Sequence, residues 1–373
     1  MEFNDRLRAS LEQILAEKNE AGVQVAAYKD GSLVLDLVAS GPDTQGPAVS
    51  GGTLLPIFSA SKGVVATCTH LLAERGQLDY DDAVARHWPE FAQNGKGAIT
   101  VRYVLTHSAG IPRSPGEDLT DWDGTVSAIA AMPTMWEPGT RTAYHGVTFG
   151  WVLGELIRRI DGRDFAAFFR AEICEPLGLQ DLYFGVSEAE ESRVVDILPP
   201  DDDDATRNPY LSTFSFLNEP RIRRAIIPAM GGIGNARSLA RVYALLAEGG
   251  TLDGVTLFSP ERVKTMRELQ VDAVDDILRL PTQRALGFLL PGPTGVGLMG
   301  AGPSAFGHTG IGGTVGLADP EHRVAFALTK NKMETSLGRR STGARVYKVL
   351  AEAMGIARDN ASHLTTDNQA QRW

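Results

Sequence analysis

The sequence contains little cysteine, with Cys68 and Cys174 as the only two among 373 residues. They are not arranged in the Cys-x-x-Cys spacing of zinc sites and redox motifs, so we expect two buried free thiols and no bound metal. The sequence also lacks an apolar run of the roughly 20 residues that a membrane-spanning helix needs. Its N-terminus has no basic segment followed by an apolar one, as a signal peptide would, and this pattern predicts a cytoplasmic protein.

Positive charge is also in the minority. Lysine and arginine number 36 against 46 aspartates and glutamates, and the net charge at pH 7 is −10. This balance argues against nucleic acids and membranes as partners, because both carry negative charge and attract basic surfaces. The composition is otherwise globular, and the length fits two domains or one large one. The oligomeric state stays open.

The two ends of the chain carry similar patterns. Residues 23–28 and 33–38 are rich in β-forming side chains and flank Asp30-Gly31, which predicts an antiparallel hairpin. A second hairpin is expected from the β-rich segments at 313–318 and 324–329. Apolar residues at helical spacing predict helices at 7–18 and 344–354, which flank the two hairpins. In the middle of the chain, the same spacing predicts helices at 63–75, 147–160, 165–174 and 239–247.

These patterns predict an α+β fold. An antiparallel sheet flanked by helices would be formed jointly by residues 1–62 and 225–373. Residues 63–224 would form an inserted, mainly helical domain. Ligand sites favour the clefts between domains, so we expect the active site between these two.

The strongest local signal is a Ser-x-x-Lys motif at Ser59 and Lys62, at the start of an expected helix. Residues three apart lie on the same helix face. A serine at a helix N-terminus lies at the positive end of the helix dipole, and a desolvated lysine could accept its proton. The alternative is a plain helix cap at Ser59 and a surface lysine.

Two further segments carry side chains suited to catalysis. Tyr144 lies in a loop just before a helix, where it could act as an acid or a base, or simply pack on the core. The segment 306–314 is rich in glycine and contains His308-Thr309-Gly310. Its free backbone N–H groups could bind an oxyanion, and the alternative is a bulged strand with a structural histidine.

Taken together, these segments resemble the superfamily of serine β-lactamases and penicillin-binding proteins, whose signatures include Ser-x-x-Lys and Lys-Thr-Gly. Residues 101–111, VRYVLTHSAGI, and residues 231–240, GGIGNARSLA, resemble the LLTHTSGL and GGLxSTAxDLA segments of one branch. That branch holds class C β-lactamases, D-Ala-D-Ala carboxypeptidases and family VIII carboxylesterases, and the last are the most similar. The resemblance covers about residues 20–355 and implies a β-lactamase/transpeptidase-like fold.

The resemblance implies a role for each matching residue. Ser59 would be the acylated nucleophile and Lys62 would activate it. Tyr144 would be the general base, or would carry the proton to the leaving group. The backbone N–H groups of Ser59 and Ile311 would form the oxyanion hole.

The third motif, His308-Thr309-Gly310, would orient Tyr144 or the substrate through His308. His107 falls in a structural motif, so we expect it to pack and form hydrogen bonds. Aromatic and heterocyclic side chains that could line the pocket or a lid, unless they pack in the core, are Trp136, His145, Phe149, Tyr210, Phe214 and Phe216.

Two departures from the family pattern bear on the substrate. Lactamases and peptidases carry Tyr-x-Asn, whose amide binds the acylamide group of their substrates, whereas this sequence has Tyr144-His145-Gly146. The lysine of the third motif is replaced by His308, which is a weaker cation at neutral pH. Both changes point towards neutral esters, although His-Thr-Gly also occurs in some peptidases of the superfamily.

The leading hypothesis is therefore a serine hydrolase that acts on small-molecule carboxylic esters through a Ser59 acyl-enzyme, without a cofactor. The sequence has no Gly-x-Ser-x-Gly, which disfavours an α/β-hydrolase. An acyltransferase with the same acyl-enzyme is the closest alternative. A β-lactamase or D-peptidase comes third, and an inactive binding protein on the same fold comes last.

Overall fold

Both ends of the chain contribute strands to one antiparallel sheet. The computed structural model describes residues 3–18, 20–41, 48–116, 118–200, 209–292, 302–334 and 340–356. The strand order in the sheet is β10-β11-β12-β1-β2. The bounds of these strands are β1 (Gly22–Lys29), β2 (Ser32–Ser40), β10 (Phe306–Thr309), β11 (Val315–Asp319) and β12 (Val324–Lys330). Both predicted hairpins are confirmed, and the pairing of β1 with β12 joins them.

The backbone conformation of the first hairpin's turn explains why the sequence has Asp-Gly there. Asp30 and Gly31 have positive φ angles of 51° and 74°. A two-residue hairpin turn with positive φ at both positions matches the twist of the strands, and Asp-Gly adopts it readily. The pairing of Lys29 with Ser32 places the turn at these two residues.

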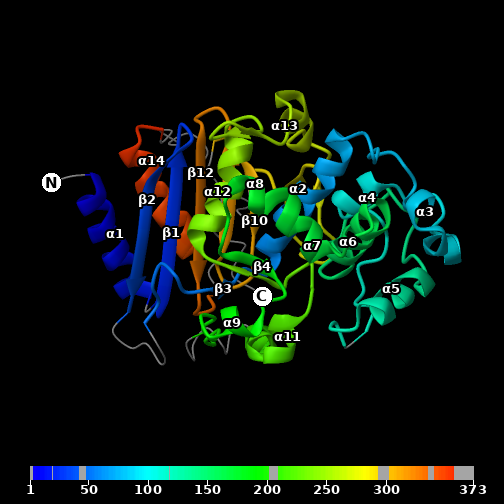
Figure 1. The fold of residues 1–373 in the computed structure, drawn as a ribbon, viewed down its shortest axis with the longest axis horizontal. Coiled ribbons are helices and arrows are strands. Elements are labelled where there is room, and N and C mark those ends of the chain that lie inside the picture. The colour runs from blue at the N-terminus through cyan, green and yellow to red at the C-terminus, as the bar shows by residue number, and fades with distance from the viewer. Residues whose placement is uncertain are drawn as a thin grey trace.

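Helices cover both faces of this sheet (Figure 1). Alternate residues of β1, such as Val23 and Val25, pack with α1 (Phe3–Lys18) and α14 (Thr342–Ala353). Ala26 and Tyr28 point to the other face, where α12 (Ala236–Ala247) crosses the sheet. Strands β1, β10, β11 and β12 are buried along almost their whole length as a result, whereas the edge strand β2 is partly exposed.

The middle of the chain forms the helical part, on the right in Figure 1. Its two central helices, α2 (Ser61–Glu74) and α6 (Thr148–Asp161), pack against each other. The expected helix at 165–174 is an α-helical turn followed by a π-helical one. The remaining helical segments are η1 (Phe58–Ala60), α3 (Val84–His87), η2 (Pro89–Gly95), α4 (Val101–Leu105), α5 (Trp122–Ala131), α7 (Phe165–Phe169), η3 (Arg170–Cys174), α8 (Glu175–Leu177), α9 (Glu188–Glu191), η4 (Pro209–Asn218), α11 (Pro220–Arg224) and α13 (Pro260–Met266).

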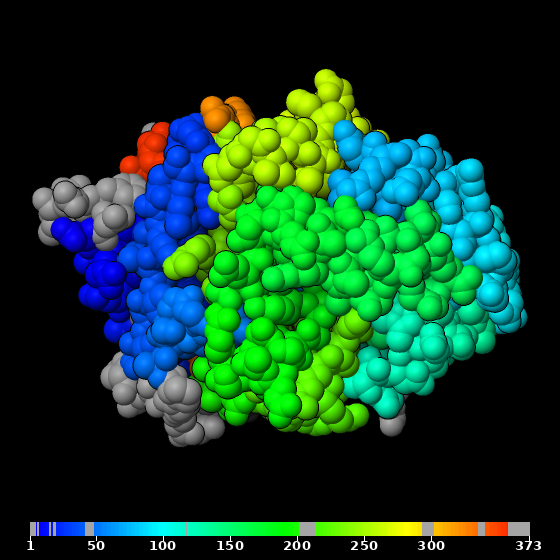
Figure 2. All heavy atoms as spheres, viewed as in Figure 1, coloured from blue at the N-terminus to red at the C-terminus, as the bar shows by residue number. Residues whose placement is uncertain are grey.

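Short strands connect the two parts. Strand β5 (Gly232–Gly234) pairs with both β3 (Leu55–Pro56) and β4 (Leu182–Phe184). Segments from before, within and after the predicted insertion therefore meet in one small sheet. One apolar core includes Ala26 and Ala327 from the large sheet together with Phe149 and Trp151 from α6. The space-filling view shows these parts in contact along the middle of the molecule (Figure 2). The remaining strands are β6 (Thr251–Leu252), β7 (Val255–Thr256), β8 (Val271–Val274) and β9 (Pro281–Arg284).

The cysteines match the expectation of buried free thiols. Cys68 and Cys174 are both buried and unpaired, and burial raises the pKa of the Cys174 thiol to about 12. Among the described residues, no helix is both long enough and apolar enough to span a bilayer.

The contact between α2 and α12 depends on a glycine. A Cβ at Gly63 would collide with the hydroxyl of Tyr243 and would lie 3.4 Å from the Cβ of His308. We predict that Gly63→Ala destabilises the protein by about 1–3 kcal/mol through overpacking, even though alanine favours a helix interior by about 1 kcal/mol. Urea unfolding measures this difference.

The matched control removes the Tyr243 hydroxyl, with which a Cβ at residue 63 would collide. Because Tyr243→Phe lacks the hydroxyl, the double variant Gly63→Ala/Tyr243→Phe should regain most of the stability relative to Tyr243→Phe alone. A Gly63→Ala protein as stable as the wild type would show that α2 and α12 can separate at no cost.

Candidate active site

Ser59 lies on a strained turn between β3 and α2. The residue before it, Phe58, has a φ of 50°, a left-handed conformation that costs a non-glycine residue about 1–2 kcal/mol. The turn is held by Ile57, whose N–H donates to the carbonyl of Gly232 at 2.8 Å. Gly310 lets the end of β10 approach, since a Cβ there would lie 2.6 Å from the carbonyl oxygen of Ile57. Ser59 itself is partly exposed, so a substrate can reach it.

Lys62 lies one helical turn further on and is completely buried. Its Nζ donates to Ser59 Oγ at 3.2 Å and to the carbonyl of Ala229 at 2.9 Å. Burial lowers the pKa of Lys62 to about 7, because the charged form loses its hydration. The sequence motif predicted the proximity of Lys62 to Ser59. It carried no signal for Ala229, which is 167 residues away along the chain.

Tyr144 joins this pair from the loop before α6. The Lys62 Nζ lies 4.9 Å from the centroid of its ring. Burial raises the pKa of Tyr144 to about 12, and a hydrogen bond with Ser59 opposes that rise. His107 lies beside the ring, with centroids 4.9 Å apart, and its Nδ1 accepts the backbone N–H of His145 at 2.9 Å. His107 therefore packs and forms a hydrogen bond, as expected.

His308 lies on β10, with its ring centroid 6.4 Å from that of Tyr144. Its Nδ1 is 2.7 Å from the carbonyl of Thr309, which assigns the proton to Nδ1 and leaves Nε2 as an acceptor. Burial lowers the pKa of His308 to about 3, helped by the nearby Lys62. The imidazole is neutral at pH 7, so it places no positive charge at the third motif.

Ile311 follows β10 on a glycine-rich turn. Within the described part of the chain, its backbone N–H has no hydrogen-bond acceptor. Its partly exposed side chain packs against an apolar cluster that includes Phe58 and Met333. An unpaired N–H in apolar surroundings suits the binding of a developing oxyanion.

Of the residues expected to line a pocket, Phe149 and His145 lie in the core, whereas Trp136 is half-buried. Phe149 and His145 are buried in the core behind Tyr144 rather than at its open side. The two ring nitrogens of His145 lie near the backbone N–H of Ile111 and the carbonyl of Ala143, so neither remains for a ligand. Trp136 is half-buried beside His145.

Two of the aromatic residues expected at a lid lie close to the turn that carries Ser59. Phe214 packs edge-on against Phe58, with centroids 6.0 Å apart, and Phe216 packs beside Phe214 at 6.2 Å. Phe214 is buried and Phe216 is partly exposed. The side chain of Tyr210 lies outside the described residues.

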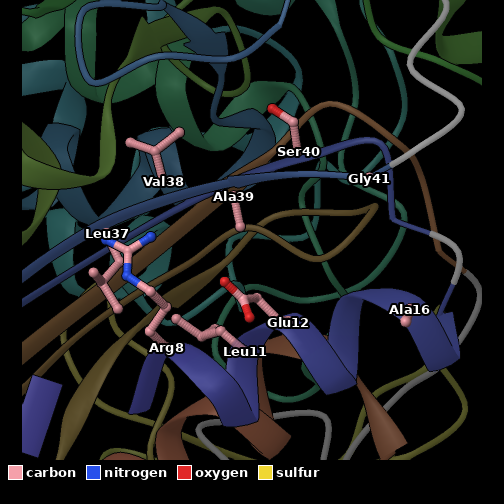
Figure 3. A pocket seen from close by; sticks show the side chains of 9 residues that line it. All are labelled: Arg8, Leu11, Glu12, Ala16, Leu37, Val38, Ala39, Ser40 and Gly41. Atoms are coloured by element: carbon pink, nitrogen blue, oxygen red, sulfur yellow. The ribbon is translucent and has the colours of Figure 1, made fainter. Parts of the chain in front are cut away.

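A groove of about 300 Å³ lies elsewhere, between α1 and β2, and its lining includes Arg8, Leu11, Glu12 and Leu37 (Figure 3). It contains none of the catalytic candidates and opens on the sheet face away from α12. It is therefore separate from the site around Ser59.

Comparisons with known proteins agree with this arrangement. The family profile described as "Beta-lactamase" matches residues 7–350. The chain belongs to the beta-lactamase family. Within this family it is 34% identical to the esterase/beta-lactamase LipL of Mycobacterium tuberculosis (strain ATCC 25618 / H37Rv) over 345 residues, which cover 85% of this chain and 78% of LipL.

Solved structures of family members show the same fold over nearly the whole chain. A family VIII carboxylesterase superposes with a TM-score of 0.85 at 31% identity, covering 95% of this chain and 98% of that one. A penicillin-binding protein homologue from Caulobacter crescentus gives a TM-score of 0.81 at 34% identity, with the same coverage. The predicted β-lactamase/transpeptidase-like fold is thus confirmed.

The burial of Lys62 predicts a pH dependence. Only its neutral form has a lone pair that can accept the Ser59 proton, so kcat/KM should fall as the pH drops below about 7. The pKa values of His308 and His145, about 3 and about 4, are too low to produce this acidic limb of the pH profile. A pH–rate profile with an activated ester measures its midpoint, because kcat/KM reports the free enzyme.

Lys62→Arg is the matched control for this limb. Its guanidinium stays charged at all accessible pH values, so the variant should be inactive across the profile. Activity with an unchanged acidic limb in Lys62→Arg would assign the limb to another group.

Proposed function

We propose that the protein is a serine esterase that cleaves small-molecule carboxylic esters through an acyl-enzyme on Ser59. The hydrogen bond between Ser59 and the buried Lys62 carries this proposal. A lysine with a pKa of about 7 is an effective base at neutral pH, and it contacts the hydroxyl that it would deprotonate. The description of LipL as an esterase and the fold shared with a family VIII carboxylesterase support the ester as substrate.

Acylation proceeds in two proton-balanced steps. Ser59 Oγ attacks the ester carbonyl while its proton passes to neutral Lys62, and the N–H groups of Ser59 and Ile311 bind the oxyanion. The carbon–oxygen bond to the alcohol then breaks. Tyr144 donates its proton to the leaving alkoxide and regains one from the Lys62 ammonium. With a pKa of about 12, Tyr144 is protonated at neutral pH and suits this donor role better than that of the first base.

Deacylation reverses these roles. Water attacks the acyl carbonyl and gives up a proton to the Lys62–Tyr144 pair, which returns one to Ser59 as the carboxylic acid leaves. An alcohol in the place of water would produce a new ester, which is the acyltransferase alternative.

Two features of the site favour esters over β-lactams. Gly146 stands where the family places the amide of Tyr-x-Asn, and a Cβ built there meets nothing within 4 Å. A β-carbon is therefore accommodated at this position, but the residue present supplies no amide group. His308 is neutral at the third motif, so it offers a substrate carboxylate no ion pair. The apolar cluster around Phe58 also suits an uncharged acyl group.

The proposal includes the remaining expectations from the sequence. The enzyme would need no cofactor and would act in the cytoplasm without nucleic acid or membrane partners. These points stay predictions.

The decisive experiment combines turnover with mass. Purified protein is incubated with p-nitrophenyl acetate, butyrate and octanoate and with nitrocefin, and intact mass spectra are recorded. We expect ester turnover, an acyl adduct on Ser59 and little nitrocefin hydrolysis. In Ser59→Ala, both turnover and adduct should disappear while the fold is retained.

Other outcomes would point elsewhere. An adduct that forms but barely hydrolyses would indicate a transferase that awaits its acceptor. Faster hydrolysis of nitrocefin than of the esters would indicate a β-lactamase. Substantial activity in Ser59→Ala would remove this residue as the nucleophile.

The open space at Gly146 provides a second test. Gly146→Asn should fold normally, because a β-carbon at this position meets no other atom within 4 Å. It should raise the ratio of nitrocefin to ester turnover by supplying the missing amide. Gly146→Val, with no hydrogen-bonding group, is the control for bulk alone. An equal change of the ratio in both variants would show that the amide is irrelevant to this choice.

A further inference from the structure

A buried ion pair lies behind the active site. Arg284, at the end of β9, is 1% exposed, and Asp275 is fully buried. Their side chains meet at 2.6 Å, from Nη2 of the arginine to a carboxylate oxygen. No motif in the sequence marks either residue. A buried ion pair is usually no more stabilising than apolar side chains of the same volume, so its presence beside a catalytic site calls for an explanation.

Arg284 and the residue after Asp275 form hydrogen bonds with the loop that carries Tyr144. The second amino group of Arg284 donates to the hydroxyl of Thr142 at 2.8 Å. The backbone N–H of Asp276 donates to the carbonyl of Thr142 at 3.0 Å. Thr142 is two residues before Tyr144, so both contacts hold the tyrosine loop from behind.

Asp275 is itself held in place by the backbone. One of its carboxylate oxygens accepts the N–H groups of Ile277 and Leu278 at 2.8 Å and 2.7 Å, while the other binds Arg284. The guanidinium therefore has a fixed orientation. Its Nε is buried and, within the described part of the chain, has no hydrogen-bond partner.

The charge of Arg284 reaches several groups of the active site. It lowers the pKa of Tyr144 against the effect of burial, while Asp275 raises that pKa by a smaller effect. Arg284 also contributes to the low pKa of His107, of His145 and of His308, and for His145 Asp275 again opposes it. Burial is the larger cause for each histidine, and all three are neutral at pH 7. The charged groups that act on this part of the site are thus Lys62, Arg284 and Asp275.

We propose that Arg284, fixed by Asp275 and Thr142, is a positioning residue that orients Tyr144 and stabilises its phenolate as the leaving group departs. In that step the O–H bond of Tyr144 breaks and its proton goes to the alkoxide oxygen. The phenolate persists until the Lys62 ammonium returns a proton. Arg284 lowers the energy of this anion, because its effect on the pKa of Tyr144 is larger than the opposing effect of Asp275.

This inference rests on the proposed esterase function and makes a specific prediction about leaving groups. A p-nitrophenolate leaves without needing a proton, whereas an alkoxide must be protonated. Loss of Arg284 should therefore slow the acylation of ethyl butyrate much more than that of p-nitrophenyl butyrate. The acyl group is the same in both esters, and kcat/KM reports the acylation step.

Three variants separate charge from packing. Arg284→Met alone would leave Asp275 buried and unpaired, which is strongly destabilising. The double variant Arg284→Met/Asp275→Asn removes both charges at similar volume and should fold. Arg284→Lys keeps the charge and should recover part of the activity. The matched control is Arg262→Met, because Arg262 also binds a carboxylate, that of Glu74 at 2.9 Å, at the far end of α2.

We expect the double variant to lose about 10- to 100-fold in kcat/KM for ethyl butyrate, a part of the range typical of lost acid–base assistance. The loss for p-nitrophenyl butyrate should be within about threefold. Arg262→Met should affect both esters equally. In a Tyr144→Phe background, the same double change should lower kcat/KM for ethyl butyrate by less than about twofold, because Arg284 and Tyr144 act as a unit.

The outcomes are distinct. Equal losses for the two esters in the double variant, or no loss at all, would overturn the role of Arg284 while leaving the esterase proposal intact. A wild-type protein that forms no acyl adduct with either ester would instead overturn the proposed function itself.

Discussion

The burial of one lysine amine is the constraint on which the active site depends. Lys62 has no exposed surface, and an ammonium group in that position loses several kcal/mol of hydration. The protein accommodates it by lowering its pKa to about 7 rather than by pairing it with a carboxylate. A carboxylate partner would keep Lys62 charged and useless as a base, whereas the hydroxyl of Ser59 and the carbonyl of Ala229 accept its hydrogen bonds without doing so.

The packing around Lys62 follows from this requirement. Helix α2 is buried from Ser61 to Ala73 because α6 and β10 pack against it and Tyr243 of α12 reaches Gly63. Glycine at 63 and at 310 permits the close approach of α12 and of β10. The sheet is assembled from both ends of the chain, so the nucleophile near its start and the third motif near its end meet at one place. Ser59, Tyr144, Thr309 and Ile311 remain partly exposed there.

The distribution of charge around the site differs from that of the Lys-Thr-Gly and Tyr-x-Asn motifs which the sequence resembles. The third motif carries a neutral His308, and the third position of the tyrosine motif is the side-chain-free Gly146. Arg284, paired with Asp275 in the interior, binds Thr142 in the loop that carries Tyr144. The cation is therefore placed to act on the tyrosine from behind, in the interior, rather than on a charged group of the substrate. This arrangement is consistent with a neutral ester in the open side of the site.

The sequence by itself determined the fold class, both hairpins, the flanking helices and the catalytic candidates Ser59, Lys62 and Tyr144. Hairpins and amphipathic helices follow from local periodicity and turn residues, and Ser-x-x-Lys is a contact within one helical turn. The pKa of Lys62, the neutrality of His308, the core positions of His145 and Phe149, and the Arg284–Asp275 pair were decided only by the tertiary structure. Burial and long-range contacts set all of them, and Ala229 lies 167 residues from the lysine it binds. A local sequence pattern cannot predict such contacts, because these groups become neighbours only in the folded chain.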